Sequence, residues 1–324
     1  MVTTEGPPLA FSGSRLSWTD LPRLVRSRIV ETVGADVISE TSATSGFSPG
    51  FASALELSDG TQVFCKAVSR EQNPHSPDLA RAEIKVAGLL PAAVPAPELL
   101  WSYDDGSWVV LGLEVVHGHL PDQPWRPEQL DRVLDAMTAL AEVDLPSPSG
   151  LASLADTVTE FAVGWQRLGE DGAAVDQAVA SLGAEGHWVR ENLDELSSAA
   201  LGAAAAAVGT HLSHGDLRAD NILLDDHHVW LVDWPLATGN GVAWFDLLGI
   251  LPSVAMQGGG DPAGLFWDHP NARGADPDAV RSVLAAMAGY FVEAAVRPAP
   301  VGIGNLRPFQ LAQGIETLRW LRTW

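Results

Sequence analysis

Residues 212–224 read L-S-H-G-D-L-R-A-D-N-I-L-L. This stretch places a histidine, two aspartates, an arginine and an asparagine within eight residues and then becomes strongly apolar. Asp216 and Asn221 are five residues apart, which is the spacing of the phosphoryl-transfer loop H-R-D-x-x-x-x-N. Such a site needs a carboxylate beside the acceptor hydroxyl, to orient it and to accept its proton. The stretch is therefore either a polar turn between two strands or a loop that carries phosphoryl-transfer chemistry.

A third polar side chain favours the chemical interpretation. Asp233 follows the apolar strand pattern V-W-L-V and lies twelve residues beyond Asn221. Magnesium prefers oxygen ligands, and an asparagine and an aspartate in these positions supply them. The spacing predicts that Asp216 is the catalytic carboxylate and that Asn221 and Asp233 hold Mg²⁺.

The motif H-G-D-x-x-x-x-N, followed by a strand and D-W, closely resembles the aminoglycoside phosphotransferase family, which shares the protein-kinase-like fold. Matching features extend over roughly residues 40–324. The resemblance implies an α+β, two-lobe molecule that uses ATP or GTP as the phosphoryl donor. Its small, β-rich N-lobe would cover residues 1–113, a hinge residues 114–119, and a larger, mainly helical C-lobe residues 120–324.

The resemblance also assigns residues outside the loop. Lys66, at the end of V-F-C-K, is similar to the strand lysine that contacts the α- and β-phosphates, and Glu83 is similar to its ion-pair partner. The segment L-G-L-E-V-V-H-G resembles the hinge whose backbone holds adenine, which points to Glu114 and Val116. Asp246, in F-D-L-L, would support the catalytic loop.

The candidate phosphate loop is S-G-F-S-P-G-F, with Ser45, Gly46, Phe47 and Ser48 as its cofactor-binding residues. It has two glycines but lacks the pattern G-x-G-x-x-G. Backbone N–H groups from Ser45 to Gly50 are still expected to cover the phosphates, because a flexible loop supplies such donors without that spacing.

Four neighbouring residues receive other interpretations. We expect His214 to anchor the loop rather than to act as a base, and Asp220 to face solvent rather than a cationic acceptor. Arg218 either neutralises the transferring phosphoryl group or faces Asp220 or water. Cys65 is interpreted as a strand-filling residue.

Composition limits the classes of protein that remain. The 324 residues are 46% hydrophobic, so the chain is globular with a sizeable core, and a single cysteine suits a reducing cytosol. The first thirty residues lack the order of a signal peptide. The most apolar run, which begins at Ala199, is shorter than the roughly 18 residues that span a membrane. We therefore expect a cytoplasmic protein that does not insert into a membrane.

The charge is strongly acidic, with a formal net value of −22. Residues 120–324 hold 27 of the 41 acidic side chains but only 11 of the 19 basic ones. Such a field repels nucleic acid and favours cationic ligands, although acidic surfaces also simply aid solubility. We expect a small cationic acceptor such as an aminoglycoside, with Asp261, Asp268 and Glu316 as candidate contacts.

Other functions stay open. Only twelve residues separate Asp233 from Asp246 and no A-P-E follows, so the chain is not expected to dock a polypeptide substrate or a protein partner. The acceptor could instead be a macrolide, an amino alcohol or a sugar. A non-catalytic nucleotide-binding regulator is the remaining alternative, and the intact set of Lys66, Asp216, Asn221 and Asp233 argues against it.

Hydrophobic periodicity and turn signals predict the individual elements. Two hairpins are expected around the D-G pairs at 59–60 and 105–106, and strand-like residues at 210–234. The expected helices are Asp20–Val33, Pro77–Leu90, the face from Leu130 to Ala141, and segments near 153–168, 187–208, 278–296 and 308–323.

Overall fold

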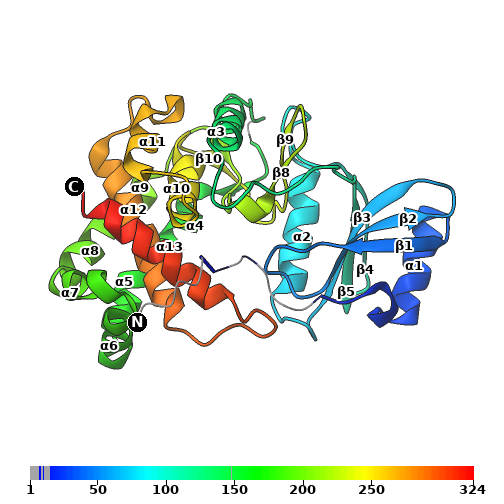
Figure 1. Cartoon of the computed structure of the whole chain (residues 1–324), viewed down its shortest axis with the longest axis horizontal. Helices are drawn as coiled ribbons and strands as arrows, with labels where there is room; N and C mark the ends of the chain where they lie inside the picture. Colours follow the sequence, from blue (N-terminus) through cyan, green and yellow to red (C-terminus); the bar gives the residue numbers. More distant parts are fainter. Residues whose placement is uncertain (1–6, 9, 11–14, 147) are drawn as a thin grey trace.

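A computed structural model describes residues 7, 8, 10, 15–146 and 148–324. The predicted start of the N-lobe at residue 1 lies outside these residues. So does part of the first thirty residues, whose sequence does not predict a signal peptide. The chain forms two lobes of different composition (Figure 1). One is a five-stranded antiparallel sheet with two helices, and the other is mainly helical. This arrangement confirms the predicted α+β, two-lobe architecture.

The N-lobe sheet has the strand order β1-β2-β3-β5-β4. Its elements are η1 (Trp18–Asp20), α1 (Arg23–Val33), β1 (Val37–Ser42), β2 (Phe51–Leu57), β3 (Gln62–Ser69), α2 (Ser76–Ala87), β4 (Leu99–Asp104) and β5 (Trp108–Leu113). Both predicted hairpins, β2–β3 and β4–β5, are present with antiparallel register. The predicted first helix begins later than expected, because the chain is extended at Leu21 and Pro22 between η1 and α1.

Alternation along β3 decides which side chains face the cleft. Val63, Cys65 and Ala67 are buried in an apolar cluster with α1. Lys66 is on the opposite face, toward α2, which lies between the sheet and the C-lobe (Figure 1). Burial raises the pKa of the Cys65 thiol, so the cysteine is a core residue, as predicted.

The C-lobe surrounds two small sheets with helices. Its helices are α3 (Pro127–Ala141), α4 (Leu154–Ala162), α5 (Gly164–Gly169), α6 (Gly172–Ser181), η2 (Gly183–Glu185), α7 (Gly186–Glu191), α8 (Leu193–Ala200), α9 (Ala203–Ala206), η3 (Ala219–Asn221), α10 (Phe245–Met256), α11 (Pro262–Asp268), η4 (Pro270–Ala272), α12 (Pro277–Ala295) and α13 (Leu306–Leu321). Its strands are β6 (Ala152–Ser153), β7 (His211–Ser213), β8 (Ile222–Leu224), β9 (Val229–Leu231) and β10 (Thr238–Gly241), arranged as β6-β10-β7 and β8-β9.

Two helix predictions for this lobe are wrong in detail. The segment near 187–208 forms three short helices, α7, α8 and α9. The break between α7 and α8 falls at Asn192, which is not helical and donates its side-chain amide to the Trp188 carbonyl oxygen at 2.8 Å. The segment near 153–168 breaks between α4 and α5. Gly164 packs there against α12, and a Cβ at this position would lie 2.5 Å from the Gly289 carbonyl carbon. The short strands β6 and β10 and the helices α6, α10 and α11 were not among the predicted elements.

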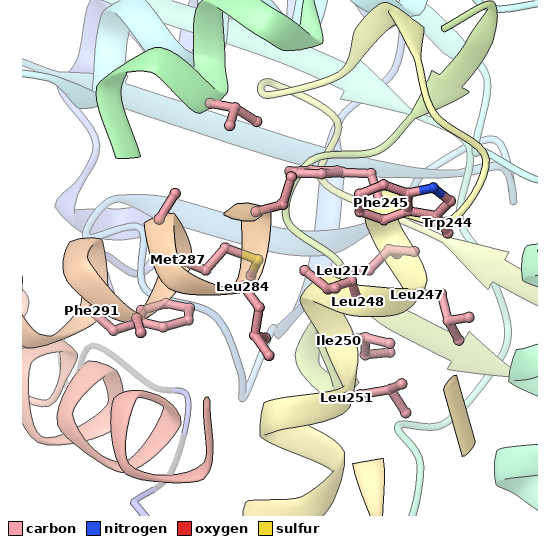
Figure 2. Close-up of a cluster of buried hydrophobic side chains, with 14 of the residues drawn as sticks. Leu217, Trp244, Phe245, Leu247, Leu248, Ile250, Leu251, Leu284, Met287 and Phe291 are labelled. Atoms are coloured by element: carbon pink, nitrogen blue, oxygen red, sulfur yellow. The ribbon is translucent and has the colours of Figure 1, made fainter. Parts of the chain in front are cut away.

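Apolar side chains of α10 and α12 form part of the C-lobe core, together with side chains of α3, α4 and α13 (Figure 2). Leu217, which lies between Asp216 and Arg218, is buried in the same cluster, close to Leu248 in Figure 2. Burying a leucine side chain contributes about 1.5–3 kcal/mol, so this contact holds the predicted catalytic loop on the core. In the described part of the chain, no helix combines the length and the apolar character that crossing a membrane requires.

Candidate active site

A cavity of about 600 Å³ lies between the lobes. Its volume falls in the range of small-molecule and cofactor sites. Among the residues that line it are most of those predicted from the sequence: Ser45, Gly46, Phe47, Ser48, Lys66, Glu83, Glu114, Val116, Asn221 and Asp233. Asp216 is not itself a lining residue, but it is hydrogen-bonded to the lining residue Asn221 and to Arg218, and its side chain is 32% exposed. One cavity therefore collects predicted residues as far apart in the sequence as Ser45 and Asp233, which are 188 positions apart.

Lys66 joins the two lobes through two carboxylates. Its Nζ lies 2.8 Å from Glu83 Oε1 and 2.7 Å from Asp233 Oδ1. The Lys66 side chain is 19% exposed and that of Glu83 is 7% exposed, so both charges are largely removed from water. Burial opposes the charge of Lys66, but Asp233 and Glu83 outweigh it and raise the lysine pKa. The implied ion pair between Lys66 and Glu83 is thus present, and the ammonium group faces the cavity.

The loop that begins at His214 is held by backbone contacts to an aspartate. Asp246, in the first turn of α10, accepts the N–H of His214 at 2.7 Å and that of Gly215 at 2.9 Å. Gly215 has φ +84°, and a Cβ there would lie 2.4 Å from the Leu236 carbonyl oxygen, so the turn requires glycine. These bonds agree with the loop-supporting position that the resemblance implied for Asp246.

His214 is fully buried and bonded on both ring nitrogens. Nε2 lies 3.0 Å from the Val232 carbonyl oxygen, and Nδ1 accepts the Asp216 N–H at 3.3 Å. The ring also contacts Trp234, with a centroid separation of 4.4 Å. Burial lowers the pKa of His214 to about 4, so the imidazole is neutral near pH 7 and serves as an anchor, as predicted.

Arg218 binds both acids of the loop. Its guanidinium donates to Asp216 through Nη1 and to both oxygens of Asp220, each at 3.0 Å. The prediction that Asp220 faces solvent is wrong, because its side chain is only 4% exposed and is bound by this two-pronged contact. The contact fixes the guanidinium next to Asp216.

The amide of Asn221 is oriented by the same loop. Its Nδ2 donates to the Asp216 carbonyl oxygen at 2.8 Å, so its side-chain oxygen is free to face the cavity as a ligand. Asp233 has φ +69°, an uncommon backbone conformation for a residue with a side chain, of the kind that is held at functional sites. No group of three or more His, Cys, Asp or Glu within the described residues could hold a metal by itself. One aspartate and one asparagine do fit Mg²⁺, which commonly binds one or two carboxylates together with substrate phosphates.

The hinge candidates also lie on the cavity wall. Glu114 donates its N–H to the Glu98 carbonyl at 2.9 Å, which leaves its own carbonyl oxygen for a ligand. At the far end of the hinge, His119 and Leu224 exchange two backbone hydrogen bonds of 2.9 and 2.8 Å. The segment that follows β5 is therefore fixed to β8 of the C-lobe.

The loop between β1 and β2 differs from the expectation. The N–H of Gly46 donates to the Ala10 carbonyl oxygen at 2.8 Å, so this predicted phosphate donor is already used. Phe47 contacts Phe309 of α13 edge to face at 5.3 Å, and the Arg218 guanidinium lies 5.4 Å from the Phe47 ring centroid. The tip of the loop therefore touches the C-lobe directly beside Asp216.

Sequence reasoning missed Arg15. Its guanidinium lines the cavity and donates to the Ser45 carbonyl oxygen at 2.6 Å and to that of Ser48. Arg15 precedes the first predicted helix and belongs to no motif. A preference for arginine over lysine throughout the chain, with 17 arginines among 19 basic residues, removed any compositional signal.

The acidic residues proposed for acceptor binding are not at the cavity. Asp261 caps α11 by accepting the N–H groups of Ala263 and Gly264. Glu316 forms an ion pair with Arg319 at 2.6 Å, and Asp268 is the last residue of α11. None of the three lines the cavity, so the prediction that they gather around the acceptor is not supported.

The ionisation of Asp216 leads to a pH-dependence prediction. Burial raises its pKa to about 6, and Arg218 partly opposes this shift. Below that pH the carboxyl group is protonated and cannot accept a proton, so we expect kcat/KM to fall about tenfold for each further pH unit. A pH–rate profile, with circular dichroism at each pH to check folding, measures this. Activity that stayed level well below the Asp216 pKa would contradict the assignment.

Comparison with known proteins agrees with this geometry. A family model described as the phosphotransferase enzyme family (APH) matches residues 46–285. The structure is similar to that of a thermostable mutant of aminoglycoside phosphotransferase APH(4)-Ia, with 19% identity, 92% of this chain and 98% of that chain covered, and a TM-score of 0.59. A ternary complex of a mutant of that enzyme with ADP and hygromycin B matches with 18% identity, coverage of 91% and 98%, and a TM-score of 0.58. ADP-bound APH(2'')-Ib matches with 10% identity, coverage of 92% and 99%, and a TM-score of 0.55.

No match was found among curated protein sequences. At the identities given above, the solved structures establish the fold alone, whereas the family model covers well over half of the chain. The protein therefore belongs to the phosphotransferase enzyme family and has the protein-kinase-like fold of the aminoglycoside phosphotransferases.

Proposed function

We propose that the protein transfers the γ-phosphoryl group of ATP or GTP to a hydroxyl group of a small molecule. The observation that supports this most directly is the cavity lined by Lys66, Asn221 and Asp233, with Asp216 bonded to Asn221 beside it. Family membership supports phosphoryl transfer but names neither the donor nor the acceptor.

In the proposed reaction, Lys66 holds the phosphates that are not transferred. The Glu83 carboxylate keeps the ammonium in place and charged. Asp216 orients the acceptor hydroxyl and takes its proton as the new oxygen–phosphorus bond forms. The bond from the γ-phosphorus to the bridging oxygen breaks, and the nucleoside diphosphate leaves with that electron pair.

Asn221 and Asp233 are the proposed ligands of Mg²⁺, because one amide oxygen and one carboxylate suit this ion. When bound, the ion supplies positive charge against the phosphates. The chain holds these two residues next to each other at the open end of the β8–β9 hairpin, one before β8 and one after β9. The backbone bond from Val232 N to Asn221 O, 2.9 Å long, keeps them at a fixed separation.

The register of the sheet suggests the direction of the nucleotide. Leu113, the last residue before the hinge, is opposite Phe64, whereas Phe51, which follows the phosphate loop, is opposite Ala67. The hinge and the loop are therefore three residues apart along β3, or about 10 Å. We propose that residues 114–119 hold the base, through Glu114 and Val116, and that Ser45–Ser48 cover the phosphates. Residues 1–113 and 120–324 would then form the two functional lobes.

A cationic acceptor such as an aminoglycoside is the acceptor class that we propose. The net charge of −22 supports it, and solved structures of the same fold include complexes with hygromycin B. We assign the reaction to the cytoplasm, because the single thiol suits a reducing compartment and the donor nucleotides are present there.

The test is an acceptor screen with purified protein, Mg²⁺ and either ATP or GTP. The panel contains aminoglycosides, macrolides, amino alcohols and sugars, and release of nucleoside diphosphate is followed. Mass spectrometry of the products identifies the acceptor by the gain of one phosphoryl group. We expect turnover with a cationic member of the panel. Nucleotide binding without turnover on any acceptor would indicate a regulator, and absence of nucleotide binding would reject the proposal.

A further inference from the structure

The carbonyl groups of the candidate phosphate loop, residues 45–48, accept hydrogen bonds from an arginine side chain. The carbonyl oxygens of Ser45 and Ser48 accept hydrogen bonds from Arg15, and that of Gly46 is 3.5 Å from Arg15 Nη2. The N–H of Gly46 is taken by Ala10, and the N–H of Leu16 donates to Gly50 O at 3.0 Å. The segment before α1 thus braces the loop on both sides.

Arg15 has donors to spare at this position. A guanidinium carries five N–H groups in a fixed fork. Two of them serve Ser45 and Ser48, and a third has only the long contact to Gly46. The Nε–H is buried and has no acceptor among the described residues. The Arg15 side chain as a whole lines the cavity, so its guanidinium lies at the border of the space in which a ligand would lie.

The guanidinium lies at the end of the cavity that the β1–β2 loop forms, because it is bonded to Ser45 and Ser48. Burial lowers the pKa of Arg15, and the Asp233 carboxylate acts against this shift, so the two groups are within electrostatic reach. The adjoining loop tip, Phe47, contacts Phe309 and Arg218, and Arg218 is bonded to Asp216. The transferring phosphoryl group must pass between the nucleotide and the hydroxyl beside Asp216. The loop tip that Arg15 holds lies next to this path.

We propose that Arg15 binds the γ-phosphoryl group of the donor nucleotide and takes the place of backbone donors that this loop lacks. The loop has no G-x-G-x-x-G pattern, and its Gly46 N–H is occupied. A guanidinium held by the loop's own carbonyls supplies a charged, forked donor to a phosphate oxygen. The inference rests on the proposed function, because it requires a nucleoside triphosphate in the cavity.

The test measures nucleotide binding by calorimetry with adenosine, ADP and AMP-PNP in the presence of Mg²⁺. If the acceptor screen shows that GTP is the donor, guanosine, GDP and GMP-PNP are used instead. Arg15→Met keeps the length of the side chain but removes the charge, and Arg15→Lys restores a charge without the fork. Arg23→Met is the matched control, since Arg23 is an exposed arginine at the start of α1.

For Arg15→Met we expect AMP-PNP to bind about 10- to 100-fold more weakly, which is the range for a hydrogen bond to a charged group. ADP should lose less affinity, and adenosine should be unaffected. Arg15→Lys should recover part of the loss, and Arg23→Met should bind all three ligands like the unmodified protein.

Other outcomes would overturn the inference. Equal losses for AMP-PNP and ADP, or for all three ligands, would show that Arg15 only orders the loop. The same conclusion follows if Arg15→Lys is no better than Arg15→Met, and unchanged affinities would remove Arg15 from the site. If the unmodified protein binds no nucleotide, the proposed function itself fails, so the two failures are distinguishable.

Discussion

In an Asp216→Asn variant, we expect kcat to fall by about 10²- to 10⁴-fold, with little change in the affinity for nucleotide. The carboxamide has nearly the shape of the carboxylate but cannot accept the proton of the acceptor hydroxyl. Asp216 does not line the cavity, whereas Lys66 and Asp233 do, so removing its charge leaves the contacts proposed for the phosphates. Steady-state kinetics and calorimetry with the nucleotide separate the two effects.

Asp226→Asn is a suitable control for this change. Asp226 is an exposed carboxylate in the β8–β9 turn, ten residues from Asp216. The variant should keep its activity and its nucleotide affinity. Turnover near the unmodified level in Asp216→Asn would exclude Asp216 as the proton acceptor. A parallel loss of nucleotide binding would instead point to disorder of the loop.

The second large effect is expected for Asp233→Asn. This change should lower kcat/KM by about 10²- to 10³-fold, because a metal ligand that stabilises transition-state charge contributes several kcal/mol. It should also raise the Mg²⁺ concentration needed for half-maximal activity. Lys66 keeps its contact to Glu83, so the N-lobe partner of the lysine is retained.

Magnesium titrations of activity and of AMP-PNP binding measure this effect, with Asp226→Asn again as the control. An unchanged Mg²⁺ requirement in Asp233→Asn would remove Asp233 from the metal site. Because Asp216→Asn should alter kcat but not the Mg²⁺ requirement, the two variants test different roles.

The predicted site residues whose placement follows from the sequence pattern are those fixed by local chain geometry. Asp216 and Asn221 belong to one turn, and the β8–β9 hairpin returns the chain to Asp233, so spacing alone brings these side chains together. The contact between Lys66 and Glu83 was inferred from family resemblance, since it joins a strand to a helix and no local pattern encodes it.

The wrong predictions concern contacts made across the molecule. Asp220 has the composition of a solvated loop residue, and its burial depends on Arg218, whose position is set in turn by Phe47 and Phe309 from distant segments. Arg15, which no prediction included, reaches the β1–β2 loop from 30 residues away. A formal charge of −22 predicted acidic acceptor contacts, but net charge does not specify where carboxylates gather, and Asp261 is used as a helix cap.

The side chain alternation in β3 has a practical consequence. Cys65, the one cysteine in the sequence, faces the α1 cluster while its neighbour Lys66 faces the cleft. Burial and a raised thiol pKa make it unreactive toward alkylating reagents in the folded protein. A cysteine introduced on the surface would be the single site for a maleimide dye. Fluorescent reporters of lobe closure can therefore be attached without first removing a native thiol.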